Sequence, residues 1–175
     1  SVVSYAEAEV AAVPGAPAAL RDDAKVDLRR QGLTALPGAL LAPLRAARVR
    51  ELNVSENALT ALPDAVARMS GLTSLIAHSN TLTDLPDAMR ALTGLTMLDL
   101  AGNRLAALGD WIAALRRLET LHLRGNELAT LPDAVAALTG LTTLTLRGNP
   151  LVRPQSPAVE GWLAALEASG CAIIG

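Results

Sequence analysis

Asparagine recurs along this chain at a fixed interval. Five of the six asparagines stand at residues 57, 80, 103, 126 and 149, and each successive difference, such as 80 − 57, is 23. A constant interval of this length indicates a chain built from one structural unit repeated, in which each unit contacts its neighbours. The repeat therefore constrains the fold more than any single residue does.

Each of these asparagines lies in the same frame of apolar residues, which reads L-x-L-x-x-N-x-L with small aliphatic substitutions. An earlier, divergent unit has Gln31 in place of the asparagine, 26 residues before Asn57, because residues 46–50 lengthen the link between the two units. The chain therefore contains six units. We number them repeat one, which contains Gln31, to repeat six, which contains Asn149.

The frame resembles the leucine-rich-repeat family, whose template L-x-x-L-x-L-x-x-N-x-L is matched from Asp23 to Leu151. A Leu-Pro step follows the asparagine in most units and resembles the 23-residue intracellular subtype found in Ras-pathway suppressors, scaffold proteins and many bacterial proteins. Repeat four departs from it with Leu108-Gly109. The resemblance implies a non-catalytic adaptor or scaffold that binds proteins.

The physics of the frame predicts the fold class independently. Two apolar residues two positions apart point to one side of a short strand, and the residue between them points to the other side. One strand per unit buries its leucines only when the units stack, so the strands run parallel. The residues after each Leu-Pro, such as Asp133 to Leu138, predict a short helix. We therefore expect an α/β solenoid with a curved parallel sheet on the concave face and short helices on the convex face.

The repeated asparagine has a structural explanation. It lies where the chain turns away from the strand, and its amide can bond backbone groups that burial would otherwise leave without partners. The glycines Gly102, Gly125 and Gly148, each directly before an asparagine, are explained by the same turn.

Both ends of the array are predicted to be helical caps, because a solenoid end exposes leucines unless something covers it. Residues 1–22 are the N-terminal cap, with helix-permissive residues 5–12, a turn over 18–22, and Val10 and Leu20 covering repeat one. Residues 23–151 hold the six repeats. Residues 152–175 form a capping helix and a closing strand over 171–174, so the chain is one single domain.

The C-terminal helix is predicted from an apolar stripe at helical spacing that follows Pro157. The stripe consists of Val159, Trp162, Leu163 and Leu166.

Composition and charge exclude several classes of function. The formal net charge is −2 and the pI about 5.7, so no overall positive field exists to bind nucleic acid. No apolar run is long enough for a membrane span and no secretory signal is visible, although a segment removed before Ser1 would leave no trace. We expect a protein partner, no nucleic acid, no membrane and a monomeric chain.

Cys171 is the only cysteine, which excludes an internal disulfide and a cysteine-rich metal site and suits a reducing, cytoplasmic (intracellular) location. It is also the one candidate nucleophile. Cysteine is among the most buried residue types and this one lies in an apolar segment, so a packing role is favoured. No phosphate-binding loop, nucleophile elbow or metal-ligand helix is present in the sequence. We predict a chain without catalytic residues, cofactor or metal.

The solvated face of the predicted sheet is the candidate binding site. The residues between the two apolar positions of successive strands are Asp27, Asn53, Ile76, Asp99, His122 and Thr145. Ile76, and Met97 two residues before Asp99, are apolar where solvated residues are expected. They predict a docking surface at the centre of the array. The alternative is a small apolar patch without a role.

Polar residues surround this centre. His78, Asp99 and His122 cluster across three strands, and we expect a cross-strand ion pair with a polar neighbour rather than a metal site. Arg124 and Arg147 give the same face a positive end that suits an acidic partner.

Trp111 occupies the slot that alanine holds in the other units. Its ring either protrudes or fills space left by Gly109, and we expect it to protrude as a contact on the convex side.

Together these residues predict a protein-binding adaptor or scaffold. The candidate partner-binding residues are Asn53, Ile76, His78, Met97, Asp99, Trp111, His122, Arg124 and Arg147. Two alternatives remain. One is a constitutive structural subunit of a large assembly, held through both faces, and the other is a host-directed bacterial effector.

Overall fold

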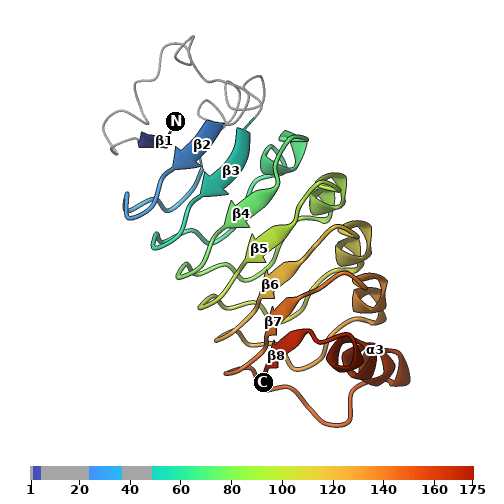
Figure 1. Cartoon of the computed structure of the whole chain (residues 1–175). Helices are drawn as coiled ribbons and strands as arrows, with labels where there is room; N and C mark the ends of the chain where they lie inside the picture. Colours follow the sequence, from blue (N-terminus) through green and yellow to red (C-terminus); the bar gives the residue numbers. More distant parts are fainter. Residues whose placement is uncertain (1, 5–23, 37–48) are drawn as a thin grey trace.

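The structure is a computed structural model that describes residues 2–4, 24–36 and 49–175. Within these residues, eight short parallel strands form one sheet, and they are ordered in space as they are in the chain (Figure 1). The strands are β1 (Val2–Ser4), β2 (Ala24–Asp27), β3 (Val49–Asn53), β4 (Ser74–Ile76), β5 (Met97–Asp99), β6 (Thr120–His122), β7 (Thr143–Thr145) and β8 (Ala172–Ile174).

The 23-residue interval sets the strand register. Leu75 pairs with Leu98, and Leu98 pairs with Leu121, so identical positions of successive units lie side by side. These leucines are fully buried in one apolar core that runs from Val26 to Leu166. The predicted solenoid of stacked units with a parallel sheet is therefore confirmed.

The segments that return from one strand to the next carry short 3-10 helices on the opposite side from the sheet (Figure 1). They are η1 (Val66–Arg68), η2 (Asp87–Ala91), η3 (Asp110–Ala114) and η4 (Asp133–Ala137). In η2 and η4 the proline is the extended residue just before the helix, and the aspartate opens the first turn. A 3-10 helix rises about 2.0 Å per residue against 1.5 Å for an α-helix, so it spans the return with fewer residues.

The repeated asparagines join each unit to the one before it. The Oδ1 atom of Asn103 accepts a hydrogen bond from the Leu82 backbone N–H at 3.0 Å. Its Nδ2 atom donates to the carbonyls of Ala77 at 3.0 Å and Leu100 at 2.9 Å. Leu82 and Ala77 belong to the preceding unit and Leu100 to its own. Asn80 and Asn126 repeat this pattern, so the predicted backbone role of the asparagine is confirmed.

The residue before each asparagine adopts a left-handed backbone conformation. In the later repeats it is glycine, as at Gly125 with φ 67°. In the earlier ones it is a residue with a side chain, as at Ser79 with φ 55° and Glu56 with φ 54°. The turn is thus the same in every unit, and glycine makes it without the steric cost that an L side chain incurs.

The C-terminal end of the array has the helix and strand that the sequence predicts. The helix α3 (Pro157–Ala168) buries its four-residue apolar stripe, and the indole N–H of Trp162 donates to the Leu138 carbonyl at 3.0 Å. The strand β8 then pairs with β7 in parallel. Gln155, whose role the sequence did not indicate, is buried and accepts a hydrogen bond from the Leu131 N–H at 2.9 Å. Like the asparagines, it bonds backbone groups of a preceding unit, here Ala129 and Leu131 of repeat five.

At the N-terminal end the structure adds a strand that the sequence did not predict. β1 pairs with β2, so the strand of repeat one is not the edge of the sheet. The expected helix over 5–12, the turn over 18–22 and the covering residues Val10 and Leu20 lie outside the described residues. None of the helices that the structure does describe is long and apolar enough to reach across a lipid bilayer.

The asparagine bonds generate a stability prediction. Asn103→Ala removes an acceptor and a donor that serve three buried backbone groups, and we expect the free energy of unfolding to fall by about 1–3 kcal/mol. Urea denaturation followed by circular dichroism measures this fall. The matched control is Asn149→Ala in the last repeat, where the side chain is only half-buried and water can replace its bonds, so the loss is smaller. Equal losses at both sites would contradict this account.

Candidate functional site

The outward side of the sheet, which we call the strand face, carries the residues that lie between the buried positions of each strand. The register aligns Asn53 with Ile76, Ile76 with Asp99, and Asp99 with His122. The next partner along this row is Thr145, followed by Ile174 in β8. The predicted row is present in register, but Thr145 is buried and its other members are half-buried, so the expectation that Thr145 is solvated is wrong. Ile174 extends it and is 51% exposed. Its position in the closing strand could have revealed it in the sequence.

Ile76 and Met97 lie diagonally across two neighbouring strands. Ile76 pairs with Asp99, two residues after Met97, and Met97 pairs with Ser74, two residues before Ile76. Both apolar side chains are half-buried, and the Ser74 hydroxyl donates to the Met97 Sδ atom at 3.3 Å. The structure therefore brings the two residues together at the centre of the strand face.

Asp99 and His122 are paired in register, but the predicted ion pair between them is wrong. Asp99 Oδ1 accepts a hydrogen bond from the Ala101 backbone N–H at 3.0 Å, and His122 Nδ1 lies 3.2 Å from the Thr145 hydroxyl. A carboxylate that bonds the N–H two residues onward satisfies the turn at the end of its own strand. Asn53 makes the same bond to the Ser55 N–H at 3.0 Å, which assigns it a structural role too.

His78 and Arg124 lie on either side of a shallow hollow of about 230 Å³ at the end of the strands. Small residues between them, Ala101 and Gly102, form its floor. His78 Nδ1 lies 3.1 Å from the Ser79 hydroxyl. Among the described residues no group of histidine, cysteine or carboxylate side chains is placed to hold a metal ion.

Charged side chains of the first two repeats pair with one another. Lys25 Nζ lies 2.9 Å from Glu51, and Arg30 Nε lies 2.5 Å from Glu56. The hydrogen bond to Arg30 lowers the pKa of the Glu56 carboxyl, and the same bond raises the pKa of the Arg30 guanidinium.

The later repeats differ from the first two. Arg124 and Arg147 are exposed, and neither is within salt-bridge distance of a described acidic residue. The positive end predicted for the strand face is therefore available to a partner.

Trp111 does not protrude, and the expectation that it does is wrong. Its side chain is 2% exposed and joins the core. The ring lies over Gly109, where a Cβ atom would come within 2.5 Å of the Trp111 Cδ1 atom. The missing side chain of Gly109 makes room for the ring, which is the alternative that the sequence left open. Trp111 is therefore not a contact on the return side.

Cys171 lies just before β8, half-buried and packed against the core. Burial raises the pKa of its thiol above the ordinary value. A raised pKa leaves less thiolate at neutral pH, which is the opposite of what a catalytic cysteine needs. The packing role that the sequence favours agrees with this environment.

Comparison with known families agrees with the geometry. Two family models, both described as leucine rich repeat, match residues 47–105 and 117–138. The chain is a leucine-rich-repeat protein. The matched residues cover repeats two to five. On either side, β2 and β7 pair in parallel with the strands of the matched repeats, so repeats one and six continue the same array. No curated protein matches the chain in sequence. Leucine-rich-repeat domains generally mediate protein–protein interaction and are typically non-catalytic.

The packing of Trp111 over Gly109 generates a second prediction. Gly109→Ala places a methyl group in contact with the ring and should lower the free energy of unfolding by about 1–3 kcal/mol. In a Trp111→Ala background the same change should cost little, because the ring is gone. A double-mutant cycle by urea denaturation gives the coupling energy. Gly140→Ala is the control, since a Cβ atom there lies 3.7 Å from its nearest neighbour. Additive effects at 109 and 111 would show that the ring lies elsewhere.

The environment of Cys171 generates a third prediction. Because its thiol is half-buried with a raised pKa, iodoacetamide at neutral pH should alkylate the folded protein more slowly than protein unfolded in urea. Mass spectrometry of the alkylated fraction over time measures both rates. Faster alkylation in the folded state would mean an activated thiolate and would support a catalytic role.

Proposed function

We propose that the chain is a non-catalytic interaction module, an adaptor or scaffold, that binds a protein partner through the strand face of repeats three to six. The observation that carries the proposal is the apolar pair Ile76 and Met97 at the centre of a face where solvated residues are expected. Binding energy in protein interfaces concentrates in a few central side chains surrounded by a polar rim.

The distribution of charge supports this choice of repeats. In repeats one and two the charged side chains of the strand face satisfy one another, as Lys25 and Glu51 do at 2.9 Å. From repeat three onward, the face has the apolar pair and then Arg124 and Arg147, which have no described acidic partner. A partner that covers side chains without an internal ion pair breaks no salt bridge of the chain. Less binding free energy is therefore lost at these positions.

The chemistry of this region indicates the kind of partner surface. An apolar side chain of the partner would contact Ile76 and Met97, and carboxylates of the partner would face Arg124 and Arg147. The hollow between His78 and Arg124, about 230 Å³, has room for one such carboxylate side chain. Opposite charges across an interface raise the association rate and set its orientation.

The burial of Trp111 favours this function over a permanent subunit held through both faces, because the aromatic anchor on the return side is absent. We extend the proposal to an intracellular location. Its support is the single half-buried cysteine, since chains in oxidising compartments commonly pair their cysteines.

The test is a double substitution at the centre of the strand face. Ile76→Asp with Met97→Asp introduces two charges where a partner would bury apolar atoms, and we expect at least about a tenfold loss of affinity. Crosslinking mass spectrometry of the endogenous complex identifies the partner, and calorimetry with that partner measures the loss.

The control variant is Val152→Asp, which makes the same apolar-to-acidic change at a residue that is 53% exposed and lies outside the strand face. It should bind the partner as the unmodified chain does. Urea denaturation shows whether each variant is folded. A folded double variant that retains full affinity would overturn the proposal.

A further inference from the structure

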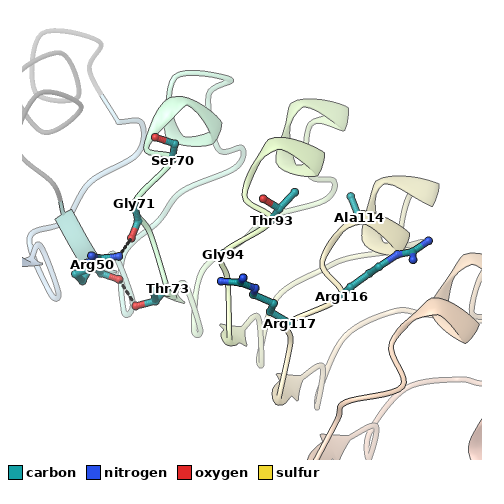
Figure 2. A pocket seen from close by; sticks show the side chains of 9 residues that line it. All are labelled: Arg50, Ser70, Gly71, Thr73, Thr93, Gly94, Ala114, Arg116 and Arg117. Carbon is teal, nitrogen blue, oxygen red and sulfur yellow. Dashed lines mark hydrogen bonds between the residues drawn. The ribbon is translucent and has the colours of Figure 1, made fainter.

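A groove of about 560 Å³ runs along the edge of the solenoid where the return segments enter the strands (Figure 2). It lies outside the strand face and crosses the units from β3 to β6. Its lining residues are Arg50, Ser70, Gly71, Thr73, Thr93, Gly94, Ala114, Arg116 and Arg117.

Two of its arginines interrupt the repeat. The position of Arg117 is held by glycine in the other units, at Gly71, Gly94 and Gly140. Arg116 likewise stands where the other units have serine or threonine. Neither change serves the stacking of the units, since the same turn forms without them in the other repeats. The arginine pair is therefore a feature of the surface of repeat four, where both side chains are exposed.

The arginines bound the groove, and small residues form its floor. Arg50 lies at one end, where its Nη1 atom donates to the Gly71 carbonyl at 3.3 Å. Figure 2 shows Arg117 reaching back toward Gly94 and Arg116 extending in the opposite direction. A side chain at Gly94 would meet only the Leu72 carbonyl, at 3.6 Å. The absence of that side chain opens the groove between Arg50 and Arg117.

The groove has positive charge without a counterion from the chain. None of its lining residues is acidic, and none of its arginines lies within salt-bridge distance of a described acidic residue. Other arginines do have such partners, as Arg90 has Asp87 at 3.3 Å. The guanidinium group is suited to carboxylates because its planar donors can bind both oxygens.

The dimensions of the groove suit an extended chain. From β3 to β6 there are three strand intervals of about 4.8 Å, or about 14 Å, which four or five residues of extended peptide span at about 3.3 Å each. We propose that this groove binds a short, extended, acidic segment of a protein partner, rich in aspartate or glutamate. Its carboxylates bind Arg50 and Arg117 within the groove and Arg116 beyond its end, and the exposed hydroxyls of Ser70 and Thr93 bond its backbone.

Nucleic acid is the disfavoured occupant. The chain has a net charge of −2, and no aromatic side chain lines the groove to stack on a base. The groove is also independent of the proposed function, because none of the strand-face residues lines it.

The test uses a fluorescein-labelled octapeptide of alternating glutamate and serine, titrated with the full chain and followed by fluorescence anisotropy at low ionic strength. The variant is Arg116→Thr with Arg117→Gly, which restores the residues of the other repeats and so keeps the fold. We expect the affinity for the octapeptide to fall by about five- to tenfold, as two exposed arginine–carboxylate contacts predict.

The matched control removes two positive charges elsewhere. Arg68→Ala and Arg104→Ala likewise introduce residues found at the same positions of other units, Ala91 and Ala58. Neither arginine lines the groove. This variant should bind the octapeptide within about twofold of the unmodified chain, because screening weakens distant exposed charges.

A second pair of variants tests shape without charge. Gly94→Leu fills the floor of the groove and should weaken binding, whereas Gly140→Leu makes the same change outside it and should not. If the arginine variant loses affinity for the octapeptide and Gly94→Leu does not, diffuse charge attraction explains the binding. That result would overturn the proposal of a binding groove.

Three further results would also overturn the proposal. The first is no binding of the octapeptide, and the second is equal loss in the arginine variant and its control. The third is tighter binding of an eight-nucleotide oligothymidylate with the same dependence on Arg116 and Arg117. The Ile76→Asp, Met97→Asp variant should retain full affinity for the octapeptide. The experiment therefore distinguishes failure of the groove proposal from failure of the proposed function of the strand face.

Discussion

The bonding of the repeated asparagines is the interaction on which the rest of the structure depends. The side chain of Asn103 accepts from one backbone N–H and donates to carbonyls of two adjacent units, and the other repeated asparagines likewise bond both units. These backbone groups are buried where the strand ends, and burial without partners is costly. The bridge can form only when neighbouring units are in register. The same residue that satisfies the turn therefore also fixes how one repeat stacks on the next, and the leucine core follows from that stacking.

The same constraint determines which surfaces are free to vary. In repeats two to six, the core positions and the repeated asparagines are occupied by internal contacts. Some outward residues are occupied as well, because Asp99 and Asn53 bond the N–H groups two residues after them. The remaining variation is concentrated at Ile76 and Met97, at Arg124 and Arg147, and at the Arg116–Arg117 pair. These residues do not help the solenoid to stack, and both proposals rest on that property. One concerns the strand face and the other the edge beside it.

Both proposed surfaces carry arginines without a described acidic partner, but the surfaces differ in depth and in apolar content. The strand face offers an apolar pair beside exposed arginines, which suits a folded surface with one aliphatic anchor. The edge offers a groove with a floor of glycines between Arg50 and Arg117, which suits an extended segment. The chain as a whole has a net charge of −2. The positive charge of these two surfaces therefore comes from where the arginines lie in the fold, and not from an excess of basic residues.

The amino-acid pattern alone was enough to predict the unit, the parallel strands and the buried leucines, because each follows from a period of 23 residues that recurs from Asn57 to Asn149. The closing helix followed from its own apolar stripe after Pro157. Features that depend on neighbours in space became visible only in the folded chain. Trp111 turned inward because Gly109 leaves room beneath its ring, and Asp99 turned to its own backbone instead of His122. The strand β1 and the basic groove likewise come from pairing and stacking between segments that are distant along the chain. A repeat pattern specifies which way each position faces, but packing among particular side chains decides which contact each one makes.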